Sequence, residues 1–166
     1  MRDITSLSQI TPLDRTDRRI LRELQTDGRL ANAALAERVG LSESACLRRV
    51  RQLEERGIIE RYAAVVNAAQ LGLTVSFMIR ITLKAQTDRD LGTFEAAVSR
   101  IPEVAECHLL TGEADYVLRV VARGAADFER LHSTVLTKLP GVARVDSSLV
   151  LRTVVRSAGL PVDDVA

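Results

Sequence analysis

The chain has 166 residues and a formal net charge of +1 at pH 7, with 46% hydrophobic and 27% charged residues. This composition is typical of a soluble globular protein, and the length allows one large domain or two small ones. No apolar run approaches the roughly 18 residues of a membrane span, and the N-terminus lacks the apolar core of a secretion signal, so we expect a cytoplasmic protein.

The cysteines and histidines do not indicate a metal site or an enzyme. Cys46 and Cys107 stand far apart among apolar neighbours, which is typical of buried small side chains. His108 follows Cys107, but adjacent strand residues point to opposite faces and do not easily share a metal. The sequence also lacks a phosphate-binding glycine loop and a nucleophile elbow. We therefore expect no catalytic residues, no metal and no cofactor.

The first predicted element is a helix that begins at Asp14. Asp14 is a suitable N-cap, and the pair Asp27-Gly28 ends the helix. Apolar residues recur on one side of it, at Ile20, Leu21 and Leu24.

Residues 32–58 predict two further helices joined by a tight turn. We expect Asn32 to cap the first of them, and Gly40 to end it in the left-handed conformation. Ser42 then caps the second helix, which runs to about Arg56. Together with the preceding helix, this pair predicts a compact three-helix unit with a helix-turn-helix.

The second helix of this pair has an apolar face and a polar face that suits a DNA major groove. Small residues at its start permit close approach to base edges, and arginines farther along reach phosphates or guanine. The candidate DNA contacts on it are Ser42, Ser44, Ala45, Arg48, Arg49, Arg51 and Gln52. A solvated basic helix face is the alternative interpretation of the same arginines.

The distribution of charge gives this DNA-binding hypothesis only weak support. Residues 1–61 contain twelve arginines and ten acidic residues, a net charge of +2, whereas residues 62–166 have a net charge of −1. The arrangement of the arginines therefore carries the hypothesis, not their total.

The apolar run after the third helix predicts a short strand. Residues 58–66 read IIERYAAVV and are followed by Asn67 and Gly72, so we expect a connecting strand and hinge over residues 62–72. The edge of such a strand would be bare in a monomer, which favours pairing with the same strand of a second copy.

Residues 73–154 predict an α+β domain of the ferredoxin-like βαββαβ type. The residues of 75–84 alternate between apolar and polar, as in a strand, and a helix capped near Asp88 or Asp90 follows. Strands at 104–111 and 115–123, a helix over 128–139 and a strand at 143–154 complete two strand-helix-strand halves. We therefore divide the chain into a DNA-binding domain (1–61), the connector (62–72) and this domain (73–166).

One face of the predicted sheet has no helices to cover it. The strand at 116–121 is apolar on both faces, and Met78 and Val150 should join the uncovered side. An apolar face of this kind is best buried against a copy of itself, so we expect a homodimer.

Three segments in this order give the chain a resemblance to the Lrp/AsnC family, the feast/famine transcriptional regulators. They are LDRTDRRIL, GLSESACLRRVRQLEERGII and CHLLTGEADYVLRV. The resemblance implies an N-terminal winged helix-turn-helix domain and a C-terminal domain for ligand binding and assembly. It also implies dimers, often gathered into octamers, whose binding to double-stranded DNA is altered by an amino acid.

The resemblance also implies an effector site between subunits, near the turn that joins the two central strands. There, Asp115 offers an anion for an ammonium group, and Gly112 permits close backbone approach to a carboxylate. The alternative is that both residues only shape a turn. Ala114 and Ser148 are smaller than residues often found at these positions in the family, which puts leucine in doubt as the ligand. The expected site residues are Leu109, Thr111, Gly112, Ala114, Asp115, Tyr116, Ser148 and Val150.

Two functions follow from these observations. The first is a DNA-binding transcriptional regulator that responds to an amino acid or a related metabolite. The alternative is an architectural protein that wraps DNA without a ligand. The two differ in whether a small molecule changes the affinity for DNA, which the sequence leaves open.

Overall fold

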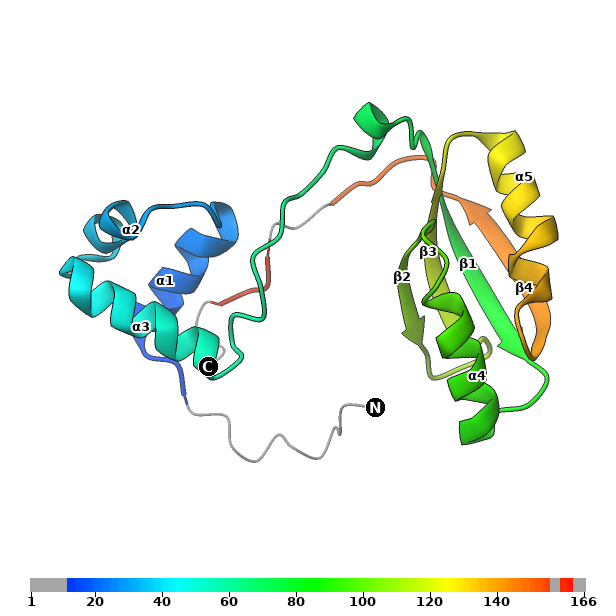
Figure 1. Cartoon of the computed structure of the whole chain (residues 1–166), viewed down its shortest axis with the longest axis horizontal. Helices are drawn as coiled ribbons and strands as arrows, with labels where there is room; N and C mark the ends of the chain where they lie inside the picture. The colour runs from blue at the N-terminus through cyan, green and yellow to red at the C-terminus, as the bar shows by residue number, and fades with distance from the viewer. Residues whose placement is uncertain (1–11, 156–158, 163–166) are drawn as a thin grey trace. The chain divides into compact units, whose positions relative to one another are not determined.

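The computed structural model describes residues 12–155 and 159–162. Its contacts divide the chain into two compact units, Met1–Val65 with Val155–Ala166, and Val66–Val154 (Figure 1). Of the described C-terminal residues, Leu160 and Val162 contact the first unit. Among the described residues, no helix is both long enough and apolar enough to cross a membrane.

The first unit contains the three predicted helices, α1 (Arg15–Thr26), α2 (Asn32–Val39) and α3 (Glu43–Glu55). The Asp14 carboxylate caps α1 by accepting the Asp17 N–H at 2.7 Å, as predicted. Gly40 ends α2 with a φ of 73°, and the Ser42 hydroxyl caps α3 by accepting the Ala45 N–H at 3.3 Å. These local signals place both ends of the turn correctly.

The predicted N-cap of α2 is wrong. Ala31 occupies the cap position, and Asn32 is the first residue of the helix. The Asn32 amide instead donates to the Glu43 carbonyl at the start of α3, at 2.9 Å. Its side chain therefore links the two helices of the helix-turn-helix, a tertiary contact that the sequence pattern of α2 does not reveal.

The helices of this unit pack around a small apolar core. Ile20, Leu35, Cys46 and Leu53 are almost fully buried and belong to one cluster. Ile58 packs against this cluster after α3 ends, as expected. Cys46 is buried among apolar side chains, which confirms that it acts as a small hydrophobic residue.

The predicted connecting strand is not formed in this chain. Residues 60–67 are exposed and form no helix or strand, and a short 3-10 helix, η2 (Ala68–Leu71), follows them. The Asn67 side chain caps η2, and Gly72 ends it with a φ of 77°. Apolar composition predicts a strand only where a neighbouring strand supplies hydrogen bonds, and one chain offers none here.

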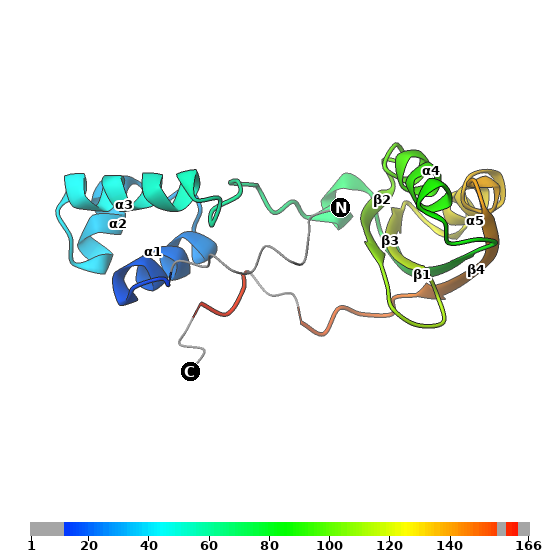
Figure 2. The same ribbon diagram turned by 90° about the horizontal axis from the view of Figure 1, so that it is seen from below.

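The second unit is a four-stranded antiparallel sheet with its helices on one face (Figure 2). The strands are ordered β2-β3-β1-β4. Along the chain the elements are β1 (Val75–Leu83), α4 (Asp88–Val98), β2 (Val104–Leu109), β3 (Tyr116–Ala122), α5 (Ala125–Thr134), η3 (Leu136–Lys138) and β4 (Val142–Leu149). This topology confirms the predicted ferredoxin-like βαββαβ arrangement.

Several element boundaries differ from the prediction, and the two central predicted strands are shorter than expected, with β2 ending at Leu109 and β3 spanning Tyr116–Ala122. Thr87, not Asp88 or Asp90, caps α4 by accepting the Asp90 N–H at 3.3 Å. The helix expected over 128–139 ends at Thr134 and continues as the 3-10 helix η3. The last strand ends at Leu149 rather than at Val154, because its register with β1 ends at the pair Phe77–Leu149, followed only by the bond from the Val150 N–H to the Ser76 carbonyl.

The core of the second unit lies between the sheet and the helices. The alternation in β1 is confirmed, because Ile79, Ile81 and Leu83 are buried on the helix side. Phe94 of α4 is fully buried there, with its ring 4.5 Å from that of Tyr116. The period of two therefore decides which face of the sheet receives the helices.

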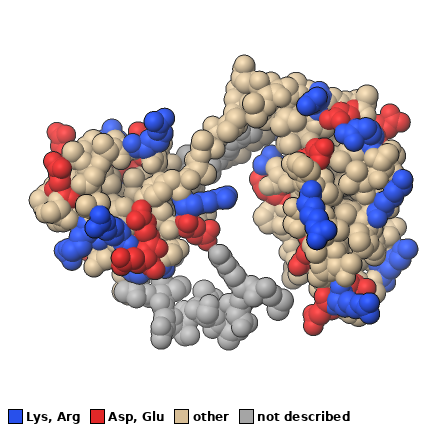
Figure 3. All heavy atoms as spheres, in the orientation of Figure 1, with Lys and Arg blue, Asp and Glu red and all other residues tan. Residues whose placement is uncertain are grey.

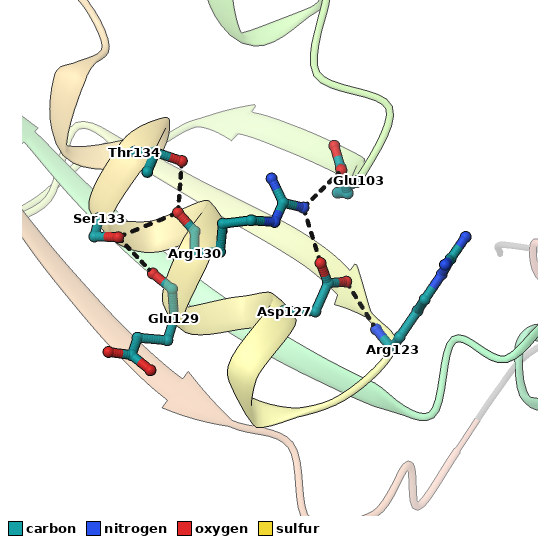
Figure 4. Close-up of polar contacts among 7 residues, drawn as sticks. All are labelled: Glu103, Arg123, Asp127, Glu129, Arg130, Ser133 and Thr134. Atoms are coloured by element: carbon teal, nitrogen blue, oxygen red, sulfur yellow. Dashed lines mark hydrogen bonds and ion pairs between the residues drawn. The ribbon is translucent and has the colours of Figure 1, made fainter.

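Charged groups fasten the start of α5 to the strand before it (Figure 4). The Asp127 carboxylate accepts the Arg123 N–H at 3.1 Å and an Arg130 guanidinium N–H at 2.8 Å. The Arg130 guanidinium also lies 4.0 Å from the Glu103 carboxylate, which precedes β2. Asp127 thus ties the first turn of α5 to the backbone of Arg123, directly after β3, while the N-cap Gly124 has no side chain to cap the helix.

We predict that Phe94→Ala will lower the free energy of unfolding by about 3–5 kcal/mol, because it removes a fully buried ring and leaves a cavity. Urea denaturation followed by circular dichroism measures this change. Leu151→Ala is the control, since Leu151 is 90% exposed and its truncation should cost little. Equal stability of the two variants would contradict the assigned core.

Candidate DNA-binding and ligand-binding sites

Most of the predicted DNA contacts lie on the exposed side of α3. The capping hydroxyl of Ser42 and the side chain of Ser44 are 3.3 Å apart at the start of the helix. Ala45 is half-buried, whereas Arg48, Arg51 and Gln52 are exposed. The opposite side of α3 carries Cys46 and Leu53, which are buried in the core of the unit. The structure therefore brings small and basic residues together on one helix face.

Arg49 is held in a different way from the other predicted contacts. Its guanidinium lies 2.6 Å from the Asp14 carboxylate and 2.8 Å from the Asp17 carboxylate, both at the start of α1. The Asp17 N–H bond and Arg49 lower the pKa of Asp14, and the two carboxylates raise the pKa of Arg49. Direct DNA contact by Arg49 would require it to leave these ion pairs, so the geometry favours a role in positioning α3 against α1.

Basic and acidic side chains are interspersed on the surface of the first unit (Figure 3). This agrees with its small net charge, and some arginines are committed to internal partners. Arg19 donates to the Arg38 carbonyl at 2.8 Å, and Arg38 pairs with Glu23 at 2.9 Å. The total of twelve arginines therefore overstates the charge that this unit offers to DNA.

The turn of the expected effector site, residues 110–115, is exposed except at its end. Thr111, Gly112 and Glu113 are exposed. Gly112 has a φ of 130°, a backbone conformation that residues other than glycine rarely adopt. Leu110 N–H donates to the Asp115 carbonyl at 2.8 Å and closes the turn.

Asp115 is buried and already hydrogen-bonded within the chain. Only 6% of its surface is exposed. Its carboxylate accepts the Leu83 N–H at 2.7 Å and the Gln86 side-chain amide at 2.6 Å. These bonds hold the end of β1 to the turn, so Asp115 has a structural role, whether or not its remaining lone pairs receive a ligand.

Tyr116 is a core residue of the second unit. It is 1% exposed, and its hydroxyl donates to the Glu95 carboxylate at 2.9 Å. Burial and this hydrogen bond raise the pKa of Tyr116 far above its ordinary value, so the hydroxyl remains a donor. Tyr116 and Leu109 both border a hollow of about 320 Å³ between α4 and β2.

The remaining effector candidates lie at the other edge of the sheet. Leu109 is on β2 and Ser148 is on β4, which are the two edge strands. Three strand spacings of about 4.8 Å separate those edges by roughly 14 Å. Ser148 pairs with Met78 on the open face, whereas Leu109 pairs with Tyr116, which faces the helices. One chain therefore does not bring the expected site residues together.

Comparison with known proteins identifies both units. A family model described as winged helix-turn-helix DNA-binding matches residues 13–60, and one described as the Lrp/AsnC ligand binding domain matches residues 76–160. The leucine-responsive regulatory protein of Rhizobium meliloti (strain 1021) is 44% identical over 142 residues, which cover 86% of this chain and 91% of that protein. The chain belongs to the Lrp/AsnC family. It is a DNA-binding transcriptional regulator with a ligand-binding domain, and its relatives are regulators rather than enzymes.

Two solved structures resemble this Lrp/AsnC protein over most of its length. A transcriptional regulator from Neisseria meningitidis in complex with L-methionine has a TM-score of 0.87 and 39% identity, covering 92% of this chain and 98% of that one. A feast or famine regulatory protein from M. tuberculosis complexed with L-methionine has a TM-score of 0.79 and 36% identity. The match covers 87% of this chain and 96% of that one. Both likenesses extend over the two units of the fold.

Sequence reasoning missed the internal partners of two site residues in this Lrp/AsnC protein. For Arg49, the acidic pair Asp14 and Asp17 in the segment LDRTDRRIL was visible, but only as a helix-capping signal. For Asp115, the partners Leu83 and Gln86 lie about thirty residues earlier and carry no sequence signal.

We predict that Arg48→Ala will weaken DNA binding by about 1–3 kcal/mol without lowering the melting temperature, since Arg48 is exposed. Arg49→Ala should lower both the DNA affinity and the melting temperature, because it leaves the carboxylate of Asp17 poorly paired, at a cost of about 1–3 kcal/mol. Gel-shift titration and thermal melting measure the two quantities.

Asp17→Asn is the matched control for Arg49, because it removes the partner without changing α3. It should reproduce the Arg49→Ala phenotype if Arg49 positions the helix. Weaker DNA binding by Arg49→Ala with an unchanged melting temperature would instead make Arg49 a direct DNA contact.

Proposed function

We propose that this regulator binds DNA as an oligomer and that a free amino acid of the size of methionine modulates its DNA binding or assembly. The observation that carries the proposal is the likeness, over both units, to two regulators solved with L-methionine. The small side chains of Ala114 and Ser148 leave room for an unbranched ligand. Binding to chromosomal DNA places the protein in the cytoplasm.

Contact with DNA is assigned to the exposed face of α3. Ser42, Ser44 and Ala45 approach the bases, while Arg48, Arg51 and Gln52 reach bases or phosphates. Arg49 supports this face through Asp14 and Asp17 at the start of α1. A base contact gives sequence specificity, and a phosphate contact gives affinity that falls with salt.

Assembly is assigned to the open face of the sheet. It carries the apolar side chains of Met78, Val117 and Val121, with Arg119 opposite Met78 and Arg80 opposite Val117. Arg119 lies 2.7 Å from Glu106, and Arg144 lies 3.0 Å from Asp146. The face thus mixes apolar side chains with charged ones, and because no helix covers it, it suits burial against a second copy. The homodimer assigned to this face further assembles to an octamer.

The effector site is assigned to the contact between copies. Leu109 and Ser148 lie at opposite edges and on opposite faces of the sheet, so only a second copy can bring such residues to one ligand. The turn residues Thr111, Gly112 and Ala114 would receive the carboxylate through backbone amides. Asp115 would receive the ammonium, with Tyr116 and Val150 completing the site.

We predict that the wild-type chain is at least dimeric and that Val117→Asp dissociates it, because the substitution replaces an apolar side chain of the open face with a carboxylate. Light scattering at several protein concentrations measures the change. Ala126→Asp is the control, since it adds the same charge to an exposed position on α5, on the helix side. A monomeric wild-type protein would refute the assembly.

We predict that L-methionine raises the melting temperature of the wild-type protein and that Asp115→Asn weakens its binding by about ten- to a hundredfold, the loss of a charge-assisted hydrogen bond. Calorimetric titration measures the affinity. The variant should also melt at a lower temperature, because one of the two internal bonds of Asp115 is weakened.

Glu113→Gln is the matched control for this experiment, because Glu113 is an exposed carboxylate on the same turn. It should bind L-methionine as the wild type does. Unchanged affinity of the Asp115→Asn variant would remove Asp115 from the effector site. A wild-type protein whose DNA binding ignores every amino acid would favour an architectural role.

A further inference from the structure

The C-terminal segment of the chain lies along a groove of the first unit. The groove is bordered by the second half of α1, the turn after it and residues 58–65, and a hollow of about 860 Å³ remains between them and the segment. Its lining includes Leu21, Leu24 and Ile59 together with Leu160 and Val162 from the C-terminus. The candidate DNA contacts on α3 are not among the lining residues, so the groove is distinct from the DNA-binding face.

Specific hydrogen bonds hold the C-terminal segment in this groove. The Gln25 side-chain amide donates to the Leu160 carbonyl at 3.1 Å, and its oxygen accepts the Leu160 N–H at 2.5 Å. A single side chain thus satisfies both backbone groups of one residue, much as a neighbouring strand would. Val162 packs against the apolar cluster of the unit.

The residue before Leu160 shows how closely the segment approaches α1. A Cβ atom on Gly159 would overlap the side chain of Gln25, including its Cβ at 2.9 Å. The observed approach therefore depends on glycine at this position. A hydrogen-bonded residue, an apolar anchor and a required glycine within four consecutive residues make this a fitted contact.

We propose that residues 159–162, here named the C-terminal strap, dock reversibly in this groove and relay the effector's signal to the DNA-binding unit. The proposal rests on the proposed amino-acid response. When the strap is docked, the two units are joined by two stretches of chain, the connector and the segment after β4. When it is released, only the connector joins them, and the orientation of α3 is less restricted.

The strap follows directly from the part of the sheet assigned to the effector. Ser148 lies at the end of β4, and the Val150 N–H donates to the Ser76 carbonyl at 2.9 Å, just beyond the strand. From Val150 to Leu160 the chain spans ten residues, at most about 35 Å when fully extended. A ligand that changes the end of β4 therefore acts on a short tether whose far end is the strap.

The docked state is held weakly enough to be reversible. The Leu160 side chain is 79% exposed, so the strap contributes little apolar surface beyond Val162. Its hydrogen bonds come from a neutral amide, and bonds of that kind add only modestly to stability in water. A ligand whose affinities for the docked and released states of the protein differ only moderately is therefore enough to open or close such a contact.

The test uses the full-length protein with Val162→Asp, which removes the apolar anchor, and Val155→Asp as its matched control. Val155 lies outside the groove lining and is 79% exposed. Hydrogen exchange should be faster over residues 58–65 in the Val162→Asp protein than in the wild type or the control. DNA titrations with and without L-methionine, on DNA selected by the wild-type protein from a random pool, measure the relay.

We expect L-methionine to change the DNA affinity of the wild type and the control severalfold, and that of the Val162→Asp protein by less than twofold. Calorimetry should show unchanged binding of L-methionine by all three proteins. Unaltered hydrogen exchange, or a Val162→Asp protein that keeps the wild-type response, would overturn the strap. A wild-type protein that ignores L-methionine would overturn the proposed effector response, and the relay with it.

Discussion

The helices of the second unit cover only one face of the sheet, and this constraint governs how the molecule works. The helix face holds the fully buried residues Ile79, Phe94 and Leu118, which make the core of one chain. The open face carries Met78, Val117 and Val121 interspersed with charged residues such as Arg119, which pairs with Glu106. Burial of the helix face therefore stabilises the monomer, while the open face remains available for a partner. A ligand site that needs residues from both edges of the sheet depends on that partner.

Periodic patterns predicted most of the fold, because they report local geometry. The period of two in β1 placed Ile79 and Ile81 toward the helices, and the caps Asp14 and Ser42 fixed the starts of two helices. The strand expected near Val65 is not formed in this chain, because the apolar pattern reports only local composition. Its composition suits a strand, but a strand also needs a hydrogen-bonding neighbour, which composition does not supply.

Candidate site residues were harder to predict, since their partners lie far away in the sequence. Arg49 was predicted from its place on α3, but its carboxylate partners come from the start of α1, more than thirty residues earlier. Asp115 was predicted from the chemistry of an ammonium ligand, yet its carboxylate holds the end of β1. In both cases only the tertiary structure shows which groups within the chain contact the charged side chain.

Arg48 and Arg49 show why neighbouring residues of one type can differ in function. A helix turns by about 100° per residue, so adjacent side chains face different surroundings. Arg48 faces solvent, whereas the guanidinium of Arg49 lies between two carboxylates. The proposed roles follow from this difference: recognition of DNA by Arg48 and positioning of α3 by Arg49. In that proposal the second role is a condition for the first, because the contacts between α3 and α1 set the direction in which α3 presents Arg48.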